Sequence, residues 1–288
     1  MTLPRPRLIL CTLLCLLATG SQAMAAYTLS MLPRYSIEEI HRRISPLADY
    51  LQTATGLTIR PVLVPTFARY RKQLASGIDI GYENPYIYAL ASADHEVVAM
   101  AEKGKDNDRF RGIIIVRSDS PVKTLAQLRG KTIAIVGFTS AGGYLSQKLT
   151  LQEHGLAVRK ECRVEEAPDN KQENVILAVY TGDADAGFIR ESALHRVDNY
   201  VPPAAIRVLA ATAWLPNWAL SVRRSMPAED REKITRALLE LPPDSPVLKA
   251  LKIKKFRRAD DAEYNSIRKA AGLPLPAGAS PDATPANH

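Results

Sequence analysis

The sequence predicts an α/β fold of two lobes, each an open and mostly parallel sheet with helices on its faces. Short β-like runs alternate with helical runs along the chain, as they do in βαβ units. The alternation restarts once, near residue 124, and 288 residues suffice for two lobes of about 100–150 residues each. We expect residues 26–117 and 212–271 to form the first lobe and residues 118–211 the second.

The first 25 residues have the three parts of a secretory signal peptide. Arg5 and Arg7 give a basic start, Leu8–Leu17 is an apolar run, and Ala23–Ala25 is a small-x-small cleavage site. The apolar run is shorter than the ~20 residues of a spanning helix, which disfavours the alternative of a retained membrane anchor. We therefore expect residues 1–25 to be removed and the protein to be periplasmic.

The cysteines and the charge add weaker indications. Leucine precedes both Cys11 and Cys15, where a lipoprotein signal would have a small residue, so no lipid anchor is expected. Cleavage would leave only Cys162, which excludes an internal disulfide, and no neighbouring base marks its thiol as a nucleophile. Without residues 1–25 the net charge is +6, the full +8 less two arginines, which weakly favours an anionic ligand.

The first run of elements follows from periodicity and caps. A helix is predicted from Ser36 to Thr55, where apolar residues recur every three or four positions. Ser36 and Glu39 can form a capping box at its start, and Gly56 can end it. Strands are predicted at Tyr27–Leu32, Leu57–Val64, Ile78–Gly81, Val97–Ala101 and Gly112–Val116, with helices at Phe67–Ala75 and from Asn84-Pro85 onward.

The second run repeats the pattern and then returns to the first lobe. Leu209–Arg223 is predicted to cross back, and the residues from Gly272 to His288, rich in Pro, Ala and Gly, to form a disordered tail. The predicted strands are Lys131–Val136, Arg163–Glu166 and Ala184–Ile189, and the predicted helices are Thr124–Leu128, Ala141–His154, Gln172–Tyr180, Ala228–Leu239 and Ala259–Ala271.

The segment with the clearest chemistry is the turn between the strand ending at Val136 and the helix ending at His154. The N–H groups at a helix start are unpaired and lie at the positive end of the dipole, so they attract anions. Thr139 and Ser140 can donate hydroxyl hydrogen bonds, and glycine at 142 and 143 lets the backbone approach a ligand. A plain helix cap with glycines for tight packing is the alternative. A nucleotide P-loop is excluded because no Gly-Lys-Ser/Thr follows.

Two further segments place polar side chains where strands end. Tyr86 and Tyr88 follow a short strand at a helix start, so they are candidates either for a ligand pocket or for the core. Arg34 and Tyr35 precede the first predicted helix, where an arginine could hold an anion or could simply be solvated.

Six phrases in order resemble the phosphonate and phosphite ABC-transporter periplasmic binding proteins, the PhnD-like family with the type II binding-protein fold. They span roughly Met31 to Leu194. The phrases are Ser45–Leu51, Gly77–Gly81 leading into Asn84–Tyr88, Leu125–Ala134, Thr139–Tyr144, Asn174–Val179 and Gly182–Gly187.

The resemblance implies a ligand in the cleft between two lobes. It places the oxyanion on Thr139, Ser140 and the amides that follow (Gly142, Gly143, Tyr144), faced by Tyr88 and the Pro33–Ser36 loop. Ala141 stands where the family often has a further hydroxyl residue, and Gln172 stands where it commonly has histidine. Glutamine donates a hydrogen bond but carries no charge. Glu191 lies where the family can place an acid for a ligand's amino group.

The predicted function is therefore that of the solute-binding component of an ABC importer for a phosphonate-, phosphite- or phosphate-like anion. The predicted partners are the small anion and, transiently, the permease in the inner membrane; no cofactor, metal ion or nucleic acid is expected, and the protein is expected to be a monomer. A receptor that reports to a membrane sensor kinase is the alternative. An enzyme is disfavoured because the five histidines lack metal-ligand spacing and no Gly-x-Ser-x-Gly elbow exists. The basic runs 69–72 and 252–258 are interpreted as solvated helix faces.

Overall fold

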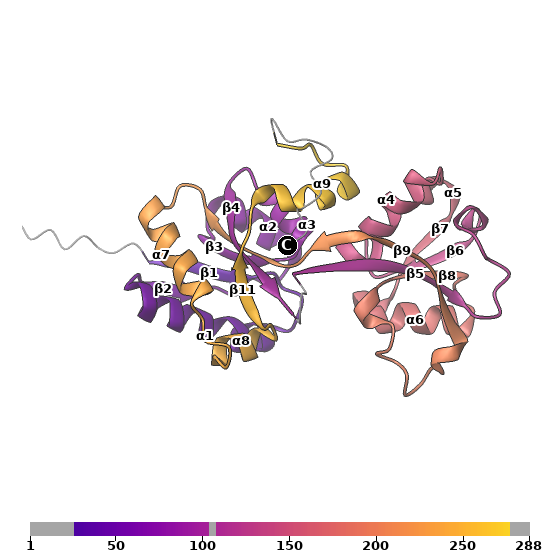
Figure 1. Cartoon of the computed structure of the whole chain (residues 1–288), viewed down its shortest axis with the longest axis horizontal. Helices are drawn as coiled ribbons and strands as arrows, with labels where there is room; N and C mark the ends of the chain where they lie inside the picture. The colour runs from indigo at the N-terminus through magenta and orange to yellow at the C-terminus, as the bar shows by residue number, and fades with distance from the viewer. Residues whose placement is uncertain (1–25, 104–107, 277–288) are drawn as a thin grey trace, which may run out of the picture.

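The computed structural model describes residues 26–103 and 108–276. Its strands form two separate sheets, and each sheet has helices against its faces, so that two lobes lie side by side in Figure 1. The predicted two-lobed α/β fold is confirmed. The expected signal peptide and the residues of the expected tail after 276 lie outside the described residues.

The first lobe contains a six-stranded sheet in the order β11-β4-β10-β3-β1-β2. β1 is parallel to β2 and β3, whereas β10 is antiparallel to both β3 and β4, and β11 is antiparallel to β4. Its register pairs Leu29 with Ile80 and Tyr82 with Leu220. The strands are β1 (Tyr27–Met31), β2 (Ile59–Pro61), β3 (Ile80–Glu83), β4 (His95–Glu102), β10 (Ala219–Arg223) and β11 (Lys255–Arg258).

The second lobe contains a five-stranded sheet in the order β7-β6-β8-β5-β9. β6 is parallel to β7 and β8, and β5 is antiparallel to β8 and β9. Both sheets are thus mixed, and the prediction of mostly parallel sheets is wrong. The strands are β5 (Arg109–Arg117), β6 (Thr132–Ile135), β7 (Arg163–Glu166), β8 (Ala186–Arg190) and β9 (Ile206–Pro216).

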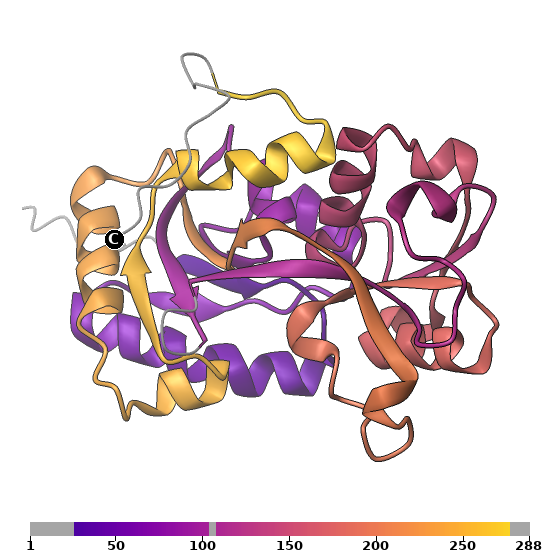
Figure 2. The ribbon, with the colours of Figure 1, turned by 45° about the vertical axis from the view of Figure 1, so that its right-hand side comes forward.

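The chain passes between the lobes at two places, between β4 and β5 and between β9 and β10. β5 and β9 pair with each other and run together from the middle of the molecule into the second lobe (Figures 1 and 2). Residues 109–117 and 206–211 both belong to the second sheet, as do residues 212–216. The lobe boundaries expected at 117/118 and 211/212 therefore differ from the division into sheets, because β5 and β9 belong to the second sheet over their whole length. The N–H of Asn217 donates to the carbonyl of Asp108 over 2.8 Å, which joins the two crossing segments.

Most of the predicted helices are present, but residues 158–161 and 246–251 form helices that were not predicted, and the helix expected over 259–271 is α-helical only from Asn265. Two further differences concern the turn predicted to bind an anion and the second basic run. The helix expected over 141–154 begins with a π-helical turn at Ala141–Leu145 and becomes α-helical only at Ser146. The segment 252–258, expected as a helix face, contains β11. The helices are α1 (Ile37–Thr55), α2 (Phe67–Ser76), α3 (Pro85–Ala91), α4 (Ser146–Glu153), α5 (Val158–Glu161), α6 (Gln172–Thr181), α7 (Ala228–Leu239), α8 (Pro246–Leu251) and α9 (Asn265–Ala271).

Caps explain where α1 begins and ends. Ser36 Oγ accepts the N–H of Glu39, and Gly56 adopts a left-handed conformation with φ of 72° that suits glycine. The Glu39 carboxylate binds Arg42 and Arg43 instead of returning to Ser36, so only half of the predicted capping box forms.

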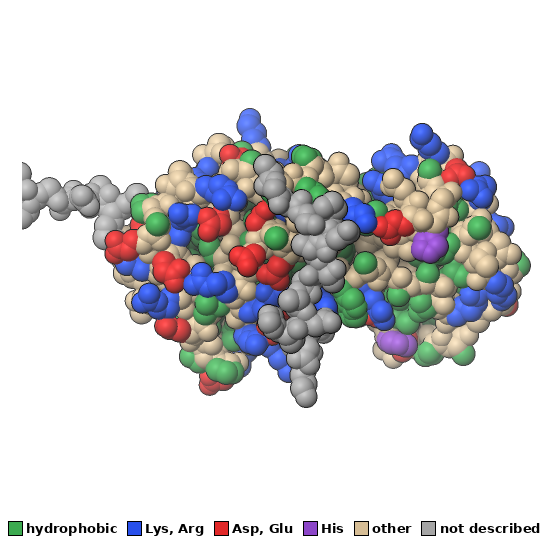
Figure 3. All heavy atoms as spheres, turned by 45° about the horizontal axis from the view of Figure 1, so that its top comes forward, with side chains coloured by type: hydrophobic (Ala, Val, Ile, Leu, Met, Phe, Trp, Pro, Cys, Tyr) green, Lys and Arg blue, Asp and Glu red, His purple; other side chains and the backbone are tan. Residues whose placement is uncertain are grey.

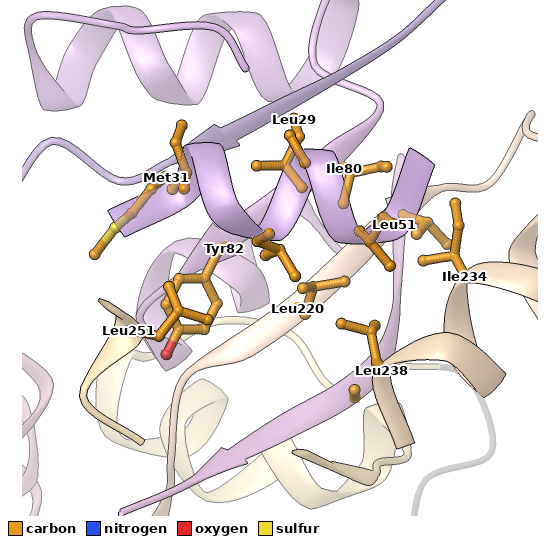
Figure 4. Close-up of a cluster of buried hydrophobic side chains, with 14 of the residues drawn as sticks. Leu29, Met31, Leu51, Ile80, Tyr82, Leu220, Ile234, Leu238 and Leu251 are labelled. Carbon is orange, nitrogen blue, oxygen red and sulfur yellow. The ribbon is translucent and has the colours of Figure 1, made fainter. Parts of the chain in front are cut away.

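One face of the first sheet is covered by α1, α7 and α8. Figure 4 shows side chains of the sheet, among them Leu29 and Leu220, meeting Leu51 of α1 and Leu238 of α7. Each of these four leucines is at most 1 % exposed. Burial of such a side chain contributes about 1.5–3 kcal/mol, so this apolar layer holds the three helices on the sheet.

The C-terminal helix α9 packs against both lobes. It contacts α3 of the first lobe and α4 of the second, and Lys269 Nζ lies 2.9 Å from a carboxylate oxygen of Glu153. Both views of the ribbon place α9 over the junction (Figures 1 and 2). Across the described residues, every helix is too short or too polar to cross a membrane.

Candidate functional site

A cleft of about 730 Å³ lies between the two lobes. Its walls include the residues that follow or end four strands: Pro33 after β1, Asn84 after β3, Val136 after β6 and Arg190 at the end of β8. Open α/β sheets place ligands at such strand ends. The first lobe contributes Pro33, Arg34, Tyr35, Phe67, Asn84, Pro85, Lys103 and Trp218, and the second contributes Phe110, Val136, Gly137, Thr139, Ser140, Ala141, Gly142, Glu166, Asp169, Asn170, Lys171, Gln172, Glu173, Arg190 and Arg196.

The turn after β6 forms part of the wall of the second lobe. Ser140 caps the π-helical turn, because its Oγ accepts the N–H of Gly143 over 3.1 Å. The hydroxyl hydrogen of Ser140 is free to donate toward the cleft, and the exposed Thr139 lies beside it. The first N–H groups of the turn lack partners within the helix. Ser140 therefore caps the helix, as the alternative interpretation of this turn predicted, and it also lines the cleft.

Arg190 is fixed next to this turn by an aromatic ring. Its guanidinium carbon lies 4.0 Å from the ring centroid of Phe110. The same ring lies against Gly142, where a Cβ atom would stand only 2.7 Å from Phe110 Cε2. Glycine is required at 142 because the ring occupies the space of a side chain. The turn, the ring and the arginine therefore form one packed unit.

Gln172 holds the backbone of the same arginine. Its side chain is 5 % exposed, and Oε1 accepts the N–H of Arg190 over 2.8 Å. Its amide nitrogen has no hydrogen bond with a described residue and remains able to donate. Gln172 also begins α6, so it links the helix start to the end of β8.

Positive charge is concentrated in the cleft. Burial, together with Arg34 and Arg196, lowers the pKa of Arg190 to about 10. Partial burial and the arginines nearby also lower the pKa of Lys103, although its side chain remains exposed to solvent. Like charges close enough to depress one another favour an anion between them.

The comparisons with known proteins identify the family of the chain. Residues 29–264 match the family model described as the phosphonate ABC-transporter periplasmic substrate-binding protein. The chain belongs to this family. It is accordingly a periplasmic substrate-binding component of an ABC transporter, which implies a permease partner in the membrane and a small solute.

Solved structures support the fold of this binding protein. It is similar to XAC2383 from Xanthomonas citri bound to ATP (TM-score 0.73, 22% identity, covering 86% of this chain and 96% of that one). It is also similar to PhnD1 from Prochlorococcus marinus in complex with methylphosphonate (TM-score 0.68, 13% identity, covering 86% of this chain and 97% of that one). A third similar structure is the binding protein component of an ABC phosphonate transporter (PA3383) from Pseudomonas aeruginosa (TM-score 0.63, 18% identity, covering 85% of this chain and 85% of that one).

The structure brings six of the eleven predicted site residues of the binding protein into the cleft wall. These are Arg34, Tyr35, Thr139, Ser140, Gly142 and Gln172. Gly143 lies just behind the wall, where a Cβ atom would be 2.5 Å from Val136 Cγ2, so it serves close packing. Tyr35 is 41 % exposed, and its ring lies 4.1 Å from the guanidinium carbon of Arg43.

The three remaining tyrosines lie in the interior instead. Tyr88 is fully buried and donates its hydroxyl hydrogen to Asp261 Oδ1 over 2.6 Å. Tyr86 is half-buried and packs against the cores of both lobes. Tyr144 is 2 % exposed and meets the ring of Phe138 edge-on. The prediction that Tyr88 faces the cleft is wrong because its hydroxyl is used to attach α3 to the C-terminal segment.

Glu191 does not line the cleft either. Its carboxylate accepts two hydrogen bonds from Arg111, at 2.9 and 2.5 Å. An acid already paired in this way is not free to bind a ligand's amino group, which removes the basis for the predicted role.

Several cleft residues of the binding protein were not predicted from the sequence: Lys103, Phe110, Arg190, Arg196 and Trp218. A usable signal existed for Arg190, because a basic residue directly follows the apolar strand that ends at Ile189. The position of Phe110 depends on the pairing of β5, which periodicity does not reveal.

Metal chemistry and the basic runs add no further site. In the described part of the chain, His, Cys, Asp and Glu do not gather in groups of three or more that could hold a metal ion. Arg257 and Arg258 form ion pairs with Asp108, Glu263 and Glu232. The face in Figure 3 shows basic and acidic side chains interspersed over the first lobe.

Proposed function

We propose that this protein binds a small oxyanion of the phosphonate, phosphite or phosphate class by closing its lobes, and delivers it to an ABC permease of the inner membrane. The observation that carries the proposal is the juxtaposition, in one cleft, of the Ser140 turn and Arg190 from one lobe with Arg34 and Lys103 from the other. Hydroxyl groups, free amides and guanidinium groups are the donors that suit phosphoryl oxygens.

Closure follows from the placement of these donors on both lobes. A ligand that contacts Arg34 and Ser140 together binds the closed state more tightly than the open one, and so shifts the population toward closure. The two crossing segments near Asp108 and Asn217 are the natural hinge. The ligands named for two relatives, methylphosphonate and ATP, both carry phosphoryl-type oxygens, which is consistent with this class.

A ligand screen tests the proposal. Thermal unfolding would be followed with phosphate, phosphite, methylphosphonate, methanesulfonate and ATP, because a ligand that binds only the folded state raises the unfolding temperature. Small-angle scattering with the best ion should show a smaller radius of gyration. The proposal fails if none of these anions stabilises the protein, and closure fails if an anion stabilises it without compaction.

A further inference from the structure

The charges of the cleft wall do not balance. Five cationic side chains and three carboxylates line it, which leaves two positive charges in excess. Lys171 lies 3.1 Å from Asp169, and Arg196 lies 3.1 Å from Glu173, so two cations are paired within the wall. Within residues 26–103 and 108–276, the remaining three form no ion pair. These are Arg34, Lys103 and Arg190.

Among these three, Arg190 is the one whose position is fixed. Its guanidinium stacks on Phe110, that ring rests on the Gly142 backbone, and Gln172 holds the Arg190 N–H. Its Nε atom is buried and has no hydrogen-bond partner. Buried polar atoms in folded proteins are nearly always satisfied, so an unused donor next to an anion-binding turn calls for a ligand. Arg34 and Lys103, by contrast, are exposed.

We propose that Arg190 makes the cleft select a doubly charged tetrahedral head group over a singly charged one of the same shape. The inference rests on the proposed function, because it assumes that the oxyanion binds in this cleft. A dianion supplies one negative charge for each of the two unpaired guanidinium groups, Arg190 and Arg34, and relieves the repulsion between them across the cleft. A monoanion leaves one positive charge uncompensated beside a desolvated guanidinium. Arginine is suited to the task because its planar group presents two parallel donors to two oxygens.

Methylphosphonate and methanesulfonate are a matched pair for the test, because they share their shape and differ in charge. Isothermal titration would measure both at a pH at which methylphosphonate is doubly ionised. The wild-type protein should bind methylphosphonate at least about tenfold more tightly than methanesulfonate. Arg190→Gln should reduce this preference about tenfold, and Arg190→Lys should retain more of it because the charge remains.

Arg196→Gln is the control, because it removes the same charge from the wall at a residue that is already paired with Glu173. It should change the preference less than Arg190→Gln. Thermal unfolding without ligand checks that each variant is folded. If Arg190→Gln does not fold, Arg190→Lys and a pH titration of the wild type replace it, since the preference should fall as methylphosphonate becomes singly charged.

The outcomes separate the two proposals. Equal affinity of the wild type for both ions, or a preference that survives in Arg190→Gln, would overturn the role of Arg190 while leaving an oxyanion-binding protein. An equal loss of preference in Arg196→Gln would mean that the number of charges matters and not this residue. Failure of the wild type to bind either ion or phosphate would overturn the proposed function itself.

Discussion

Ser221 Oγ lies 2.6 Å from Oε1 of Glu83 in the core of the first lobe. The pair is part of a chain of polar groups that joins β3, β4 and β10. Tyr70 donates to the other carboxyl oxygen of Glu83 over 2.9 Å, and His95 Nδ1 lies 3.0 Å from Ser221 Oγ. His95 Nε2 lies 2.9 Å from the carbonyl of Leu74. Each of these four side chains is 0 % exposed, so their hydrogen bonds are made with one another and with neighbouring backbone carbonyls, and bulk water does not take part.

Counting hydrogens locates the proton of this chain. The Leu74 carbonyl only accepts, so a neutral His95 carries its hydrogen on Nε2 and accepts from Ser221 at Nδ1. Ser221 has one hydrogen, so Glu83 must then donate to Ser221 and be protonated. Burial raises the pKa of Glu83 to about 7 and lowers the pKa of His95 to about 4. Both shifts favour the neutral pair over the alternative of an ionised pair.

We predict that Glu83 makes the stability of the protein depend on pH. The folded protein holds this proton more tightly than the unfolded chain, so the contribution is complete below the ordinary pKa of 4.5 and is lost as the pH rises through about 7. A shift of this size corresponds to about 3 kcal/mol. Glu83→Gln keeps one acceptor and one donor without a titrating group, so it should show a smaller loss. Chemical denaturation of both proteins between about pH 5 and pH 8 measures the difference, because the titration of His95 is common to the two proteins and cancels in the comparison. If the free energies of unfolding of the two proteins change with pH in the same way, Glu83 is already ionised in the folded protein.

Tyr88→Phe should lower stability and leave ligand affinity unchanged. The hydroxyl donates to Asp261 and accepts the N–H of Val97, and its loss should cost about 1–2 kcal/mol. Tyr86→Phe is a suitable control, because its hydroxyl has no hydrogen bond with a described residue, and it should cost less. Urea denaturation and a titration with methylphosphonate give the two values. Weaker binding at unchanged stability would return Tyr88 to the cleft.

Ser140→Ala and Gly142→Ala should differ in what they damage. Ser140→Ala removes the proposed donor to the ligand, which should weaken affinity about tenfold or more, and removes a cap worth about 1 kcal/mol. Gly142→Ala drives a methyl group against Phe110, so it should displace Arg190 as well and cost about 1–3 kcal/mol of stability. Titration and thermal unfolding of both variants measure the two effects. Full affinity in both variants would reduce the turn to an ordinary helix cap.

Glu191→Gln should have little effect on binding. Its carboxylate is paired with Arg111, and the pair is partly exposed to solvent, so its loss should cost only about 0.2–1 kcal/mol of stability. The informative measurement is the affinity for 2-aminoethylphosphonate relative to methylphosphonate. A selective loss of the amino compound in the variant would mean that Glu191 leaves Arg111 and reaches the ligand.

Local sequence signals were enough to predict the helices that are defined by their capping residues and by an amphipathic pattern. α1 begins and ends within a residue or two of the predicted positions, and α3 begins at the predicted Asn84-Pro85, because the capping groups are adjacent in sequence. The direction and partners of β5, β9 and β10 could not be predicted in this way. Their pairing joins residues about 70 to 140 positions apart and depends on contacts that no local pattern encodes.

The site was predictable to a similar extent. Thr139 and Ser140 were found because the turn and the helix start are contiguous. Tyr88 was misplaced because a helix start at a strand end has two sides, and only the contact with Asp261 decides which side its ring takes. Phe110 and Arg190 come from different strands, and their stacking exists only once β5 and β8 have paired.

The position of β10 also sets an order of assembly as the exported chain emerges into the periplasm from its N-terminus. The second sheet is contained within residues 109–216, so all its strands are available as soon as that stretch has emerged. The first sheet cannot close, because β10 lies between β3 and β4 and follows them by more than 100 residues in the chain. Until residues 219–223 arrive, β3 and β4 each have an unpaired edge, and such edges invite pairing with other chains. The first lobe, although it begins the sequence, is therefore the lobe that finishes folding last. Until then it is also the lobe that depends most on being kept apart from other chains.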